Sequence, residues 1–441
     1  MTFIKNQRRL IAMLACTTFI LSACSAPSGV VNNNNPAPST GAAGVSKAKT
    51  KVTWLQYWKS EVGEKPLNDL KAGFEAKNPD IELDIQDMPF SQMHDKLVTL
   101  HAAGNVPDLI LLTSPWVAEF AASGITEPLD TYYNAMPKEF QTSNEGPYWS
   151  PWKGKHYGMG FITGNTALFY NKKKLAEANL TPPTTWDEYR SASIKLADAS
   201  KNKFAFTGNM ASEPPSTINT ELWPFILQAG GKLTENNKAV FNSPEGVKAL
   251  EYYKGLIKTD KVATPGELSA GEKEKRSNFS AENTAFMFDG PWGIAIQKTA
   301  NPNLDFGVVP MPKGAVGATI AGGGAIGMMS KSKNKDAAWK VLTYMMEPST
   351  QIAWAKATNN FPHNKTALKD DYIQKNPLLK VFADQNESLK PINPDLQLPE
   401  STVMRKIMIN EIQNYLTDKK TAQQALDDAA TGWNAVFDKY K

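Results

Sequence analysis

Residues 51–116 decide the fold, and they read KVTWLQYWKSEVGEKPLNDLKAGFEAKNPDIELDIQDMPFSQMHDKLVTLHAAGNVPDLILLTSPW. Three segments predict strands: residues 52–58 are apolar and aromatic, residues 81–86 alternate between apolar and polar, and residues 109–112 are continuously apolar. The two segments between them carry apolar residues at helical spacing. This β-α-β-α-β order predicts an α/β fold with a mainly parallel sheet, in which ligands bind beyond the carboxyl ends of the strands.

Helix signals continue along the chain. Residues 185–188 (TWDE) have capping-box spacing after two prolines, and Asn334 precedes a second stretch with helical spacing. Residues 422–436 keep an apolar face at helical spacing. The length of 441 residues favours two or three domains.

The N-terminal segment is typical of an exported protein. Residues 1–23 contain a basic start and an apolar run over residues 10–21 that is too short to span a bilayer, which predicts a signal peptide. The sequence LSAC, ending at Cys24, resembles the bacterial lipoprotein signal, in which the cysteine carries diacylglycerol and palmitate. The alternative is an ordinary export signal. Residues 24–47 are rich in Ser, Ala, Pro, Gly and Asn and predict a flexible tether.

Charge and cysteine content exclude several classes. The chain has 48 basic and 44 acidic residues, but three basic residues lie in the predicted signal, so we expect no nucleic-acid partner. Cys16 would be removed with the signal, so we expect no disulfide within one chain. With 41% hydrophobic and 21% charged residues, neither a disordered nor a multi-span membrane protein fits.

No motif predicts a metal or a cofactor. The four histidines form no ligand pattern, and His94 and His101 share a helix face that we expect to be solvated. Residues 322–327 (GGGAIG) fit the G-x-G-x-x-G pattern, but the next helix begins only at Asn334, so a dinucleotide site is not favoured. These glycines instead favour a tight strand or a close approach of the backbone to a solute.

Six segments together resemble the extracellular solute-binding proteins of ABC importers, in the carbohydrate-binding group that is similar to maltose-binding protein. They follow one another in the order found in that family and span most of residues 50–441. The segments are PDLILLTSPWVAEFAASGITEPLD (107–130), HYGMGFITGNTALFYNKKKLAEANLTPPTTWDEY (156–189), AFMFDGPWGIA (285–295), FGVVPMPKG (306–314), GGGAIGMMSKSKNKDAAWKVLTYMM (322–346) and FPHNKTAL (361–368).

The resemblance implies a two-lobed, type II periplasmic-binding-protein-like fold. Three hinge crossings, near residues 160–165, 309–313 and 348–351, would join the lobes, and the solute would lie between them. The first lobe would comprise residues 48–160 plus 313–350, and the second residues 161–312 plus 351–441. The implied protein is a monomer without enzymatic activity, anchored by lipid at the outer face of the bacterial membrane. It would capture a sugar and deliver it to an ABC permease.

Aromatic plates and hydrogen-bond acceptors are the chemistry that a sugar needs, because its rings have apolar faces and hydroxyl edges. Trp58 and Trp116 follow predicted strands at the ligand-binding edge and are candidates on that ground. Asp289 could accept from two hydroxyls or could cap the helix that follows it. The glycine-rich segment adds Gly323 and Gly324. The resemblance adds the remaining candidates, which are Trp223, Trp292, Trp354, Asn360 and His363.

Two alternatives stay open. A surface-anchored glycoside hydrolase would need paired carboxyl groups, for which the candidates are Asp108, Glu119 and Asp289. The same binding fold could instead hold a non-sugar solute such as a phosphorylated polyol. A phosphate would call for arginines, and the part after residue 23 has only three, at positions 190, 276 and 405.

Overall fold

The computed structural model describes residues 48–146, 151–212, 218, 220–391 and 398–440. The signal peptide, Cys24 and the tether predicted from the sequence lie outside these residues. Residues 48–441 form one compact unit. Within the part that the structure describes, no helix is long and apolar enough to cross a membrane.

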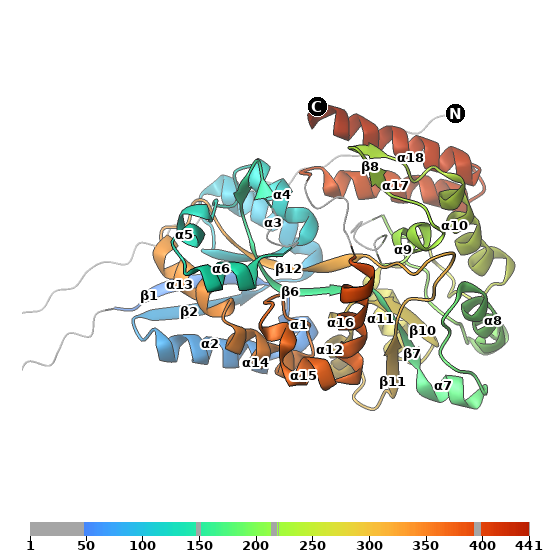
Figure 1. The fold of residues 1–441 in the computed structure, drawn as a ribbon, viewed down its shortest axis with the longest axis horizontal. Helices are drawn as coiled ribbons and strands as arrows, with labels where there is room; N and C mark the ends of the chain where they lie inside the picture. The colour runs from blue at the N-terminus through green and yellow to red at the C-terminus, as the bar shows by residue number, and fades with distance from the viewer. Residues whose placement is uncertain (1–47, 147–150, 213–217, 219, 392–397, 441) are drawn as a thin grey trace, which may run out of the picture. The chain divides into compact units, whose positions relative to one another are not determined.

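A five-stranded sheet, in the order β2-β1-β3-β12-β6, organises the first lobe (Figure 1). The strands β1, β2 and β3 pair in parallel, whereas β12 runs antiparallel to both β3 and β6. The parallel sheet predicted from residues 51–116 is therefore confirmed. Helices α2, α4 and α13 pack against this sheet. The strands are β1 (Thr50–Gln56), β2 (Ile81–Asp87), β3 (Leu109–Thr113), β6 (Met159–Asn165) and β12 (Ala321–Met328).

A three-stranded antiparallel sheet, in the order β10-β7-β11, organises the second lobe. One face of this sheet packs against a large apolar core that includes Trp223, Trp433 and Met408. The other face packs against a smaller core around Phe169 and Phe306. Its strands are β7 (Ala167–Asn171), β10 (Phe286–Asp289) and β11 (Phe306–Val309); the short hairpins elsewhere are β4 (Pro151–Trp152) with β5 (Lys155–His156), and β8 (Thr234–Glu235) with β9 (Lys238–Ala239).

Eighteen α-helices lie among the described residues. Those of the first half are α1 (Lys59–Val62), α2 (Glu64–Lys77), α3 (Phe90–Ala103), α4 (Ser114–Ala122), α5 (Asp130–Asn134), α6 (Lys138–Asn144), α7 (Lys172–Glu177), α8 (Trp186–Leu196) and α9 (Leu222–Gln228). The others are α10 (Pro244–Lys254), α11 (Glu272–Ser280), α12 (Trp292–Ala300), α13 (Lys335–Met345), α14 (Pro348–Thr358), α15 (Asp371–Lys375), α16 (Pro377–Leu389), α17 (Ser401–Leu416) and α18 (Ala422–Phe437).

The helix signals in the sequence are confirmed. Thr185 caps α8 by accepting a hydrogen bond from the backbone N of Glu188, while the Glu188 carboxylate accepts from the backbone N of Thr184 rather than from that of Thr185. Asn334 immediately precedes α13, and α18 buries the apolar face predicted for residues 422–436. Gly104 ends α3 in the left-handed conformation, with φ of 72°, which a residue without Cβ adopts at little cost.

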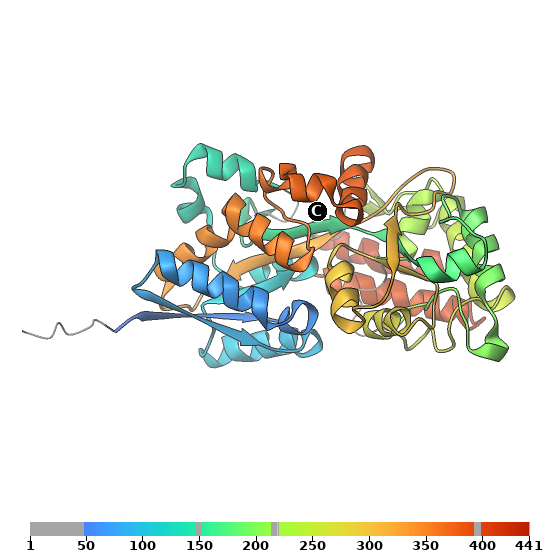
Figure 2. The ribbon, with the colours of Figure 1, turned by 90° about the horizontal axis from the view of Figure 1, so that it is seen from below.

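The chain passes between the two sheets where β6 and β12 lie side by side (Figure 2). Only Thr166 separates β6 from β7, and its carbonyl accepts from the hydroxyl of Thr319, which precedes β12. Phe361 lies on the other side of β6, where its carbonyl accepts a hydrogen bond from the backbone N of Thr163. The residue bounds given above for the lobes and crossings stay a prediction.

Candidate functional site

Aromatic side chains follow all three parallel strands at their carboxyl ends. Tyr57 and Trp58 come after β1, Phe90 opens α3 after β2, and Trp116 lies in the first turn of α4 after β3. The ring centroids of Tyr57 and Phe90 are 5.1 Å apart, and those of Phe90 and Trp116 are 5.3 Å apart with nearly parallel rings. These four residues form a continuous row that we call the aromatic strip.

Tyr57, Trp58 and Trp116 are buried, and Phe90 is the most exposed member of the strip. Trp58 is buried and packs on Phe161 and Trp354, with centroids 5.5 and 5.3 Å away, so it supports the strip from within the first core. Phe90 is only half-buried, which leaves part of its ring uncovered. Gln56 fixes the turn after β1, because its side-chain oxygen accepts from the backbone N of Trp58.

Charged side chains face one another where α1 of the first lobe packs against α12 of the second, next to α11. Arg276 makes a bidentate ion pair with Asp289, through Nε to Oδ2 at 2.7 Å and Nη2 to Oδ1 at 3.0 Å. Its Nη2 also lies 3.1 Å from Glu272, one helical turn earlier. The charges of these three residues influence the pKa of Glu61 in α1. We call these four residues the interlobe charge cluster.

Burial sets the electrostatics of this cluster. Burial raises the pKa of Glu61 to about 7, although the positive charge of Arg276 opposes that shift. Burial also disfavours ionisation of Asp289, but the Arg276 guanidinium outweighs it and holds the pKa of this carboxyl below its usual value. Asp289 is therefore a fixed anion, whereas Glu61 is poised between its two states near neutral pH.

Asp289 also positions Trp292. The indole Nε1 donates to Asp289 Oδ1 at 2.7 Å, and the ring is half-buried. The ring lies so close to Gly290 and Gly322 that a Cβ there would come within 2.3 and 2.8 Å of its atoms. Asp289 does not cap α12 through a side-chain hydrogen bond to the helix. Its side chain instead joins Arg276 and Trp292 at the lobe boundary.

A buried polar network extends from the charge cluster into the second lobe. Tyr253 donates to Glu221 at 2.9 Å, and Asn209, with its amide nitrogen turned toward the carboxylate, donates at 2.9 and 3.0 Å. Burial raises the pKa of Glu221 to about 7, and the charge of Glu272 adds to the shift. Lys275, also buried, donates to Thr220 at 3.3 Å. The negative charge of Glu272 thus acts on both Glu221 and Glu61.

A second contact between the lobes lies where α4 packs against α17. The Nε2 of His94 lies 2.7 Å from Glu119 Oε1, and the hydroxyl of Thr402 donates to Glu119 Oε2 at 3.2 Å. The hydrogen bond that His94 donates to Glu119 is the main reason that the pKa of His94 is raised to about 9. The expectation that His94 is a solvated helix residue is therefore wrong, because a carboxylate from another helix pairs with it.

The remaining candidates fall into separate environments. Trp223 is fully buried in the second core, where its ring meets Trp433 edge-on at 5.8 Å and lies under the guanidinium of Arg405 at 5.0 Å. Gly323 and Gly324 lie in β12, and a Cβ on Gly324 would come to 3.4 Å from the ring of Trp58.

Trp354, Asn360 and His363 lie near one another in the chain after α14 begins, and all three are buried. The indole nitrogen of Trp354 and the side-chain oxygen of Asn360 have no hydrogen-bond partner among the described residues. Burial lowers the pKa of His363 to about 4, and its Nε2 lies 3.2 Å from the carbonyl of Asn144. The binding roles of all ten candidates stay predictions.

Sequence patterns alone did not single out Glu61, Glu272, Phe90 or Thr402. One signal was available for Glu272, since it lies four residues before Arg276, one of the few arginines. The others are brought to the site by contacts between elements that are distant in sequence.

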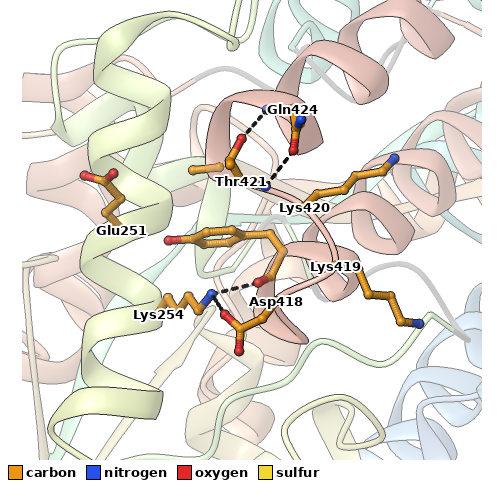
Figure 3. Close-up of a pocket in the computed structure, with 9 residues that line it drawn as sticks. Glu251, Lys254, Asp418, Lys419, Lys420, Thr421 and Gln424 are labelled. Atoms are coloured by element: carbon orange, nitrogen blue, oxygen red, sulfur yellow. Dashed lines mark hydrogen bonds and ion pairs between the residues drawn. The ribbon is translucent and has the colours of Figure 1, made fainter.

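A shallow hollow of about 480 Å³ lies elsewhere on the second lobe, between α10 and the turn from α17 to α18 (Figure 3). Two of its three lysines are paired with carboxylates. Lys254 lies 2.5 Å from Asp418 and over the ring of Tyr415, and Lys420 contacts Glu411 and Asp428.

A sequence profile of the bacterial extracellular solute-binding proteins matches residues 69–381. The chain belongs to this family. The maltotriose-binding protein of Pyrococcus abyssi is 27% identical over 344 residues, which is 75% of this chain and 71% of that one. The sn-glycerol-3-phosphate-binding periplasmic protein of Shigella flexneri is 26% identical over 417 residues, covering 88% of this chain and 94% of that one.

Solved structures agree with this assignment. An ABC-transporter solute-binding protein from Thermotoga lettingae, bound with α-D-tagatose, matches with a TM-score of 0.81 and 26% identity, over 88% of this chain and 100% of that one. The two-lobed fold of solute-binding proteins, predicted from the sequence, is thereby confirmed. In this family member, the aromatic strip of one lobe and the charge cluster shared by both lie where the lobes meet.

Proposed function

We propose that this solute-binding protein captures a sugar or oligosaccharide between its lobes and delivers it to the permease of an ABC importer. The observation that supports this most is the aromatic strip at the carboxyl ends of β1, β2 and β3. Aromatic rings stack on the apolar faces of a sugar, and the polar groups across the boundary can accept and donate to its hydroxyls. The relatives named for maltotriose and crystallised with tagatose support a sugar as the solute.

Capture would work by closure. The lobes already touch at α1 with α12 and at α4 with α17. A solute that contacts the strip and the charge cluster together binds the closed arrangement better than an open one, and it shifts the population by that difference in affinity. The hydrogen bond from Thr402 to Glu119 would break on opening and re-form on closure.

Asp108, Glu119 and Asp289, the three carboxyl groups that the sequence offers as hydrolase candidates, argue for binding rather than hydrolysis. Asp108 accepts from Thr53, Ser332 and Asn334, so it holds loops of the first lobe together. Glu119 and Asp289 are each held by a cation. None of these three is free to donate a proton to a glycosidic oxygen, which is what a glycoside hydrolase requires of its acid.

Location follows from the N-terminal sequence. Export through residues 1–23 and a lipid on Cys24 would hold a monomer at the outer face of the bacterial membrane, on the tether of residues 24–47. Two or more acyl chains suffice for stable anchoring without a spanning helix. Mass spectrometry of the membrane fraction would detect the lipid. Recovery of the unmodified full-length or simply cleaved chain would contradict the anchor.

A thermal-shift screen of the purified protein with mono- and oligosaccharides tests the function. Solute at one hundred times its Kd should add about 2.7 kcal/mol of stability, which is readily measured. Trp116→Ala and Trp292→Ala should weaken binding, and Trp58→Ala should weaken it indirectly by removing the support of the strip. If no saccharide raises the Tm, or if the saccharide is cleaved during incubation, the proposal is wrong.

A further inference from the structure

We propose that the site takes uncharged or amine-bearing saccharides and excludes phosphorylated solutes, and that Glu61 is the residue that sets this preference. The inference rests on the proposed function and adds the charge class of the solute. It separates this chain from the relative named for sn-glycerol-3-phosphate, which is 26% identical.

Glu61 is the unpaired carboxylate of the interlobe charge cluster. It lies in α1, directly after the Tyr57 and Trp58 end of the aromatic strip, and it is half-buried. No hydrogen bond or ion pair joins its carboxylate to any residue that the structure describes. A hydroxyl or ammonium group that donates a hydrogen bond stabilises a half-buried carboxylate without a partner, because this bond replaces the hydrogen bonds to water that burial has removed.

The two cations near Glu61, Arg276 and Lys275, interact with other residues. Arg276 is held by Asp289 and Glu272 through three contacts of 2.7 to 3.1 Å. Lys275 is buried and donates to Thr220. The charge cluster and the adjacent network together contain four carboxyl groups and two cations, so the region is negative on balance when they are ionised.

A phosphate group would therefore meet carboxylates without a free cation. Bidentate recognition of phosphate needs an arginine with two available donor groups, and the Nε and Nη2 donors of Arg276 are directed to Asp289 and Glu272. Like charges brought together at an interface are strongly unfavourable. A neutral hydroxyl avoids this repulsion, and an ammonium turns it into attraction.

Isothermal titration at pH 8, where Glu61 is ionised, tests the inference. The probes are maltotriose, tagatose, glucose, glucosamine, glucose 6-phosphate and sn-glycerol-3-phosphate. We expect binding of at least one uncharged or amine-bearing probe, and affinity at least about 100-fold lower for both phosphate esters. If a phosphate ester binds as well as the uncharged probes, this inference fails while the proposed function stands. If no probe binds, both fail.

Two substitutions assign the preference to Glu61. Glu61→Gln keeps a hydrogen-bonding group but removes the charge. It should reduce the ratio of the affinities for uncharged and phosphorylated probes by about tenfold. Glu61→Lys should reduce this affinity ratio further and abolish any preference for glucosamine over glucose. Glu64→Gln is the matched control, because Glu64 lies three residues away, is exposed and pairs with Lys59. Equal discrimination by all four proteins, each with an unchanged far-ultraviolet circular dichroism spectrum, would overturn the assignment.

Discussion

Asp289→Asn is the substitution whose effect the structure constrains best. Asp289 is fully buried, makes the bidentate pair with Arg276 and accepts from Trp292. The new amide has nearly the same shape but no charge, so Arg276 would keep only the pair with Glu272. Removing one partner from a buried ion pair leaves an uncompensated charge and costs about 3–5 kcal/mol.

The size of the protein converts this cost into a shift of Tm. Unfolding entropy is about 2.1 cal/mol/K per residue, so roughly 390 residues give about 0.8 kcal/mol/K. A loss of about 4 kcal/mol should then lower the Tm by about 5 °C, provided that the two lobes unfold together. Differential scanning calorimetry measures the shift and shows whether one transition or two are present.

A second ion pair supplies the control. Arg190 holds Asp260 with the same bidentate geometry, at 2.6 and 2.9 Å, but the arginine side chain is 45% exposed and the pair lies outside the site. Asp260→Asn should therefore cost only about 1 kcal/mol and leave saccharide binding unchanged. If Asp289→Asn costs no more than this control, or if it leaves the fluorescence of Trp292 unaltered, the role assigned to the buried pair is wrong.

Three further substitutions test other parts of the structure. Burial raises the pKa of Glu61 from its ordinary 4.5 to about 7, so the folded state retains a proton that the unfolded chain loses, and stability falls as pH rises between these values. Glu61→Gln should thus gain up to about 2 kcal/mol over the parent at pH 8 and nothing at pH 4, as denaturant unfolding would show; a gain independent of pH would contradict this. Gly322→Ala should push Trp292 aside, cost about 1–3 kcal/mol and shift its fluorescence, whereas Gly317→Ala, with only ordinary contacts at 3.4 Å, should do neither. Trp223→Ala should cost about 3–5 kcal/mol, while Trp223→Phe should retain saccharide binding; lost binding with unchanged stability would place Trp223 in the site instead.

Local patterns predicted the elements that local interactions form. The parallel strands β1, β2 and β3 could be predicted because the alternation of apolar and polar residues, and continuous apolar runs, reflect directly which side chains are buried. The position of Trp116 at the edge of the sheet also followed, since the carboxyl ends of parallel strands meet there. The capping of α8 depends on residues only three positions apart.

The environment of individual side chains could not be predicted in the same way. Tyr57 and Trp58 are adjacent in sequence and both are buried in the first core, where Phe90 packs on Tyr57 while Phe161 and Trp354 pack on Trp58. Glu119 receives a hydrogen bond from Thr402, 283 residues further along the chain. Such pairings depend on how α4 and α17 meet, which no local pattern encodes.

The fully buried state of Trp223 has the same origin. Its segment has the composition of a site, but α9 packs into the core formed with α17 and α18, and the ring contacts Trp433. Composition shows that an aromatic residue is available, whereas packing decides whether it faces a solute or a core.

Titration of the purified protein with neutral mono- and oligosaccharides, followed by calorimetry and repeated on Phe90→Ala and Trp116→Ala, tests the binding function most directly. We expect one saccharide to bind in a ratio of one to one and to be recovered intact, and each aromatic substitution to weaken it by about tenfold or more. Absence of binding to every saccharide, or equal affinity in the parent and both variants, would contradict a sugar site on the aromatic strip.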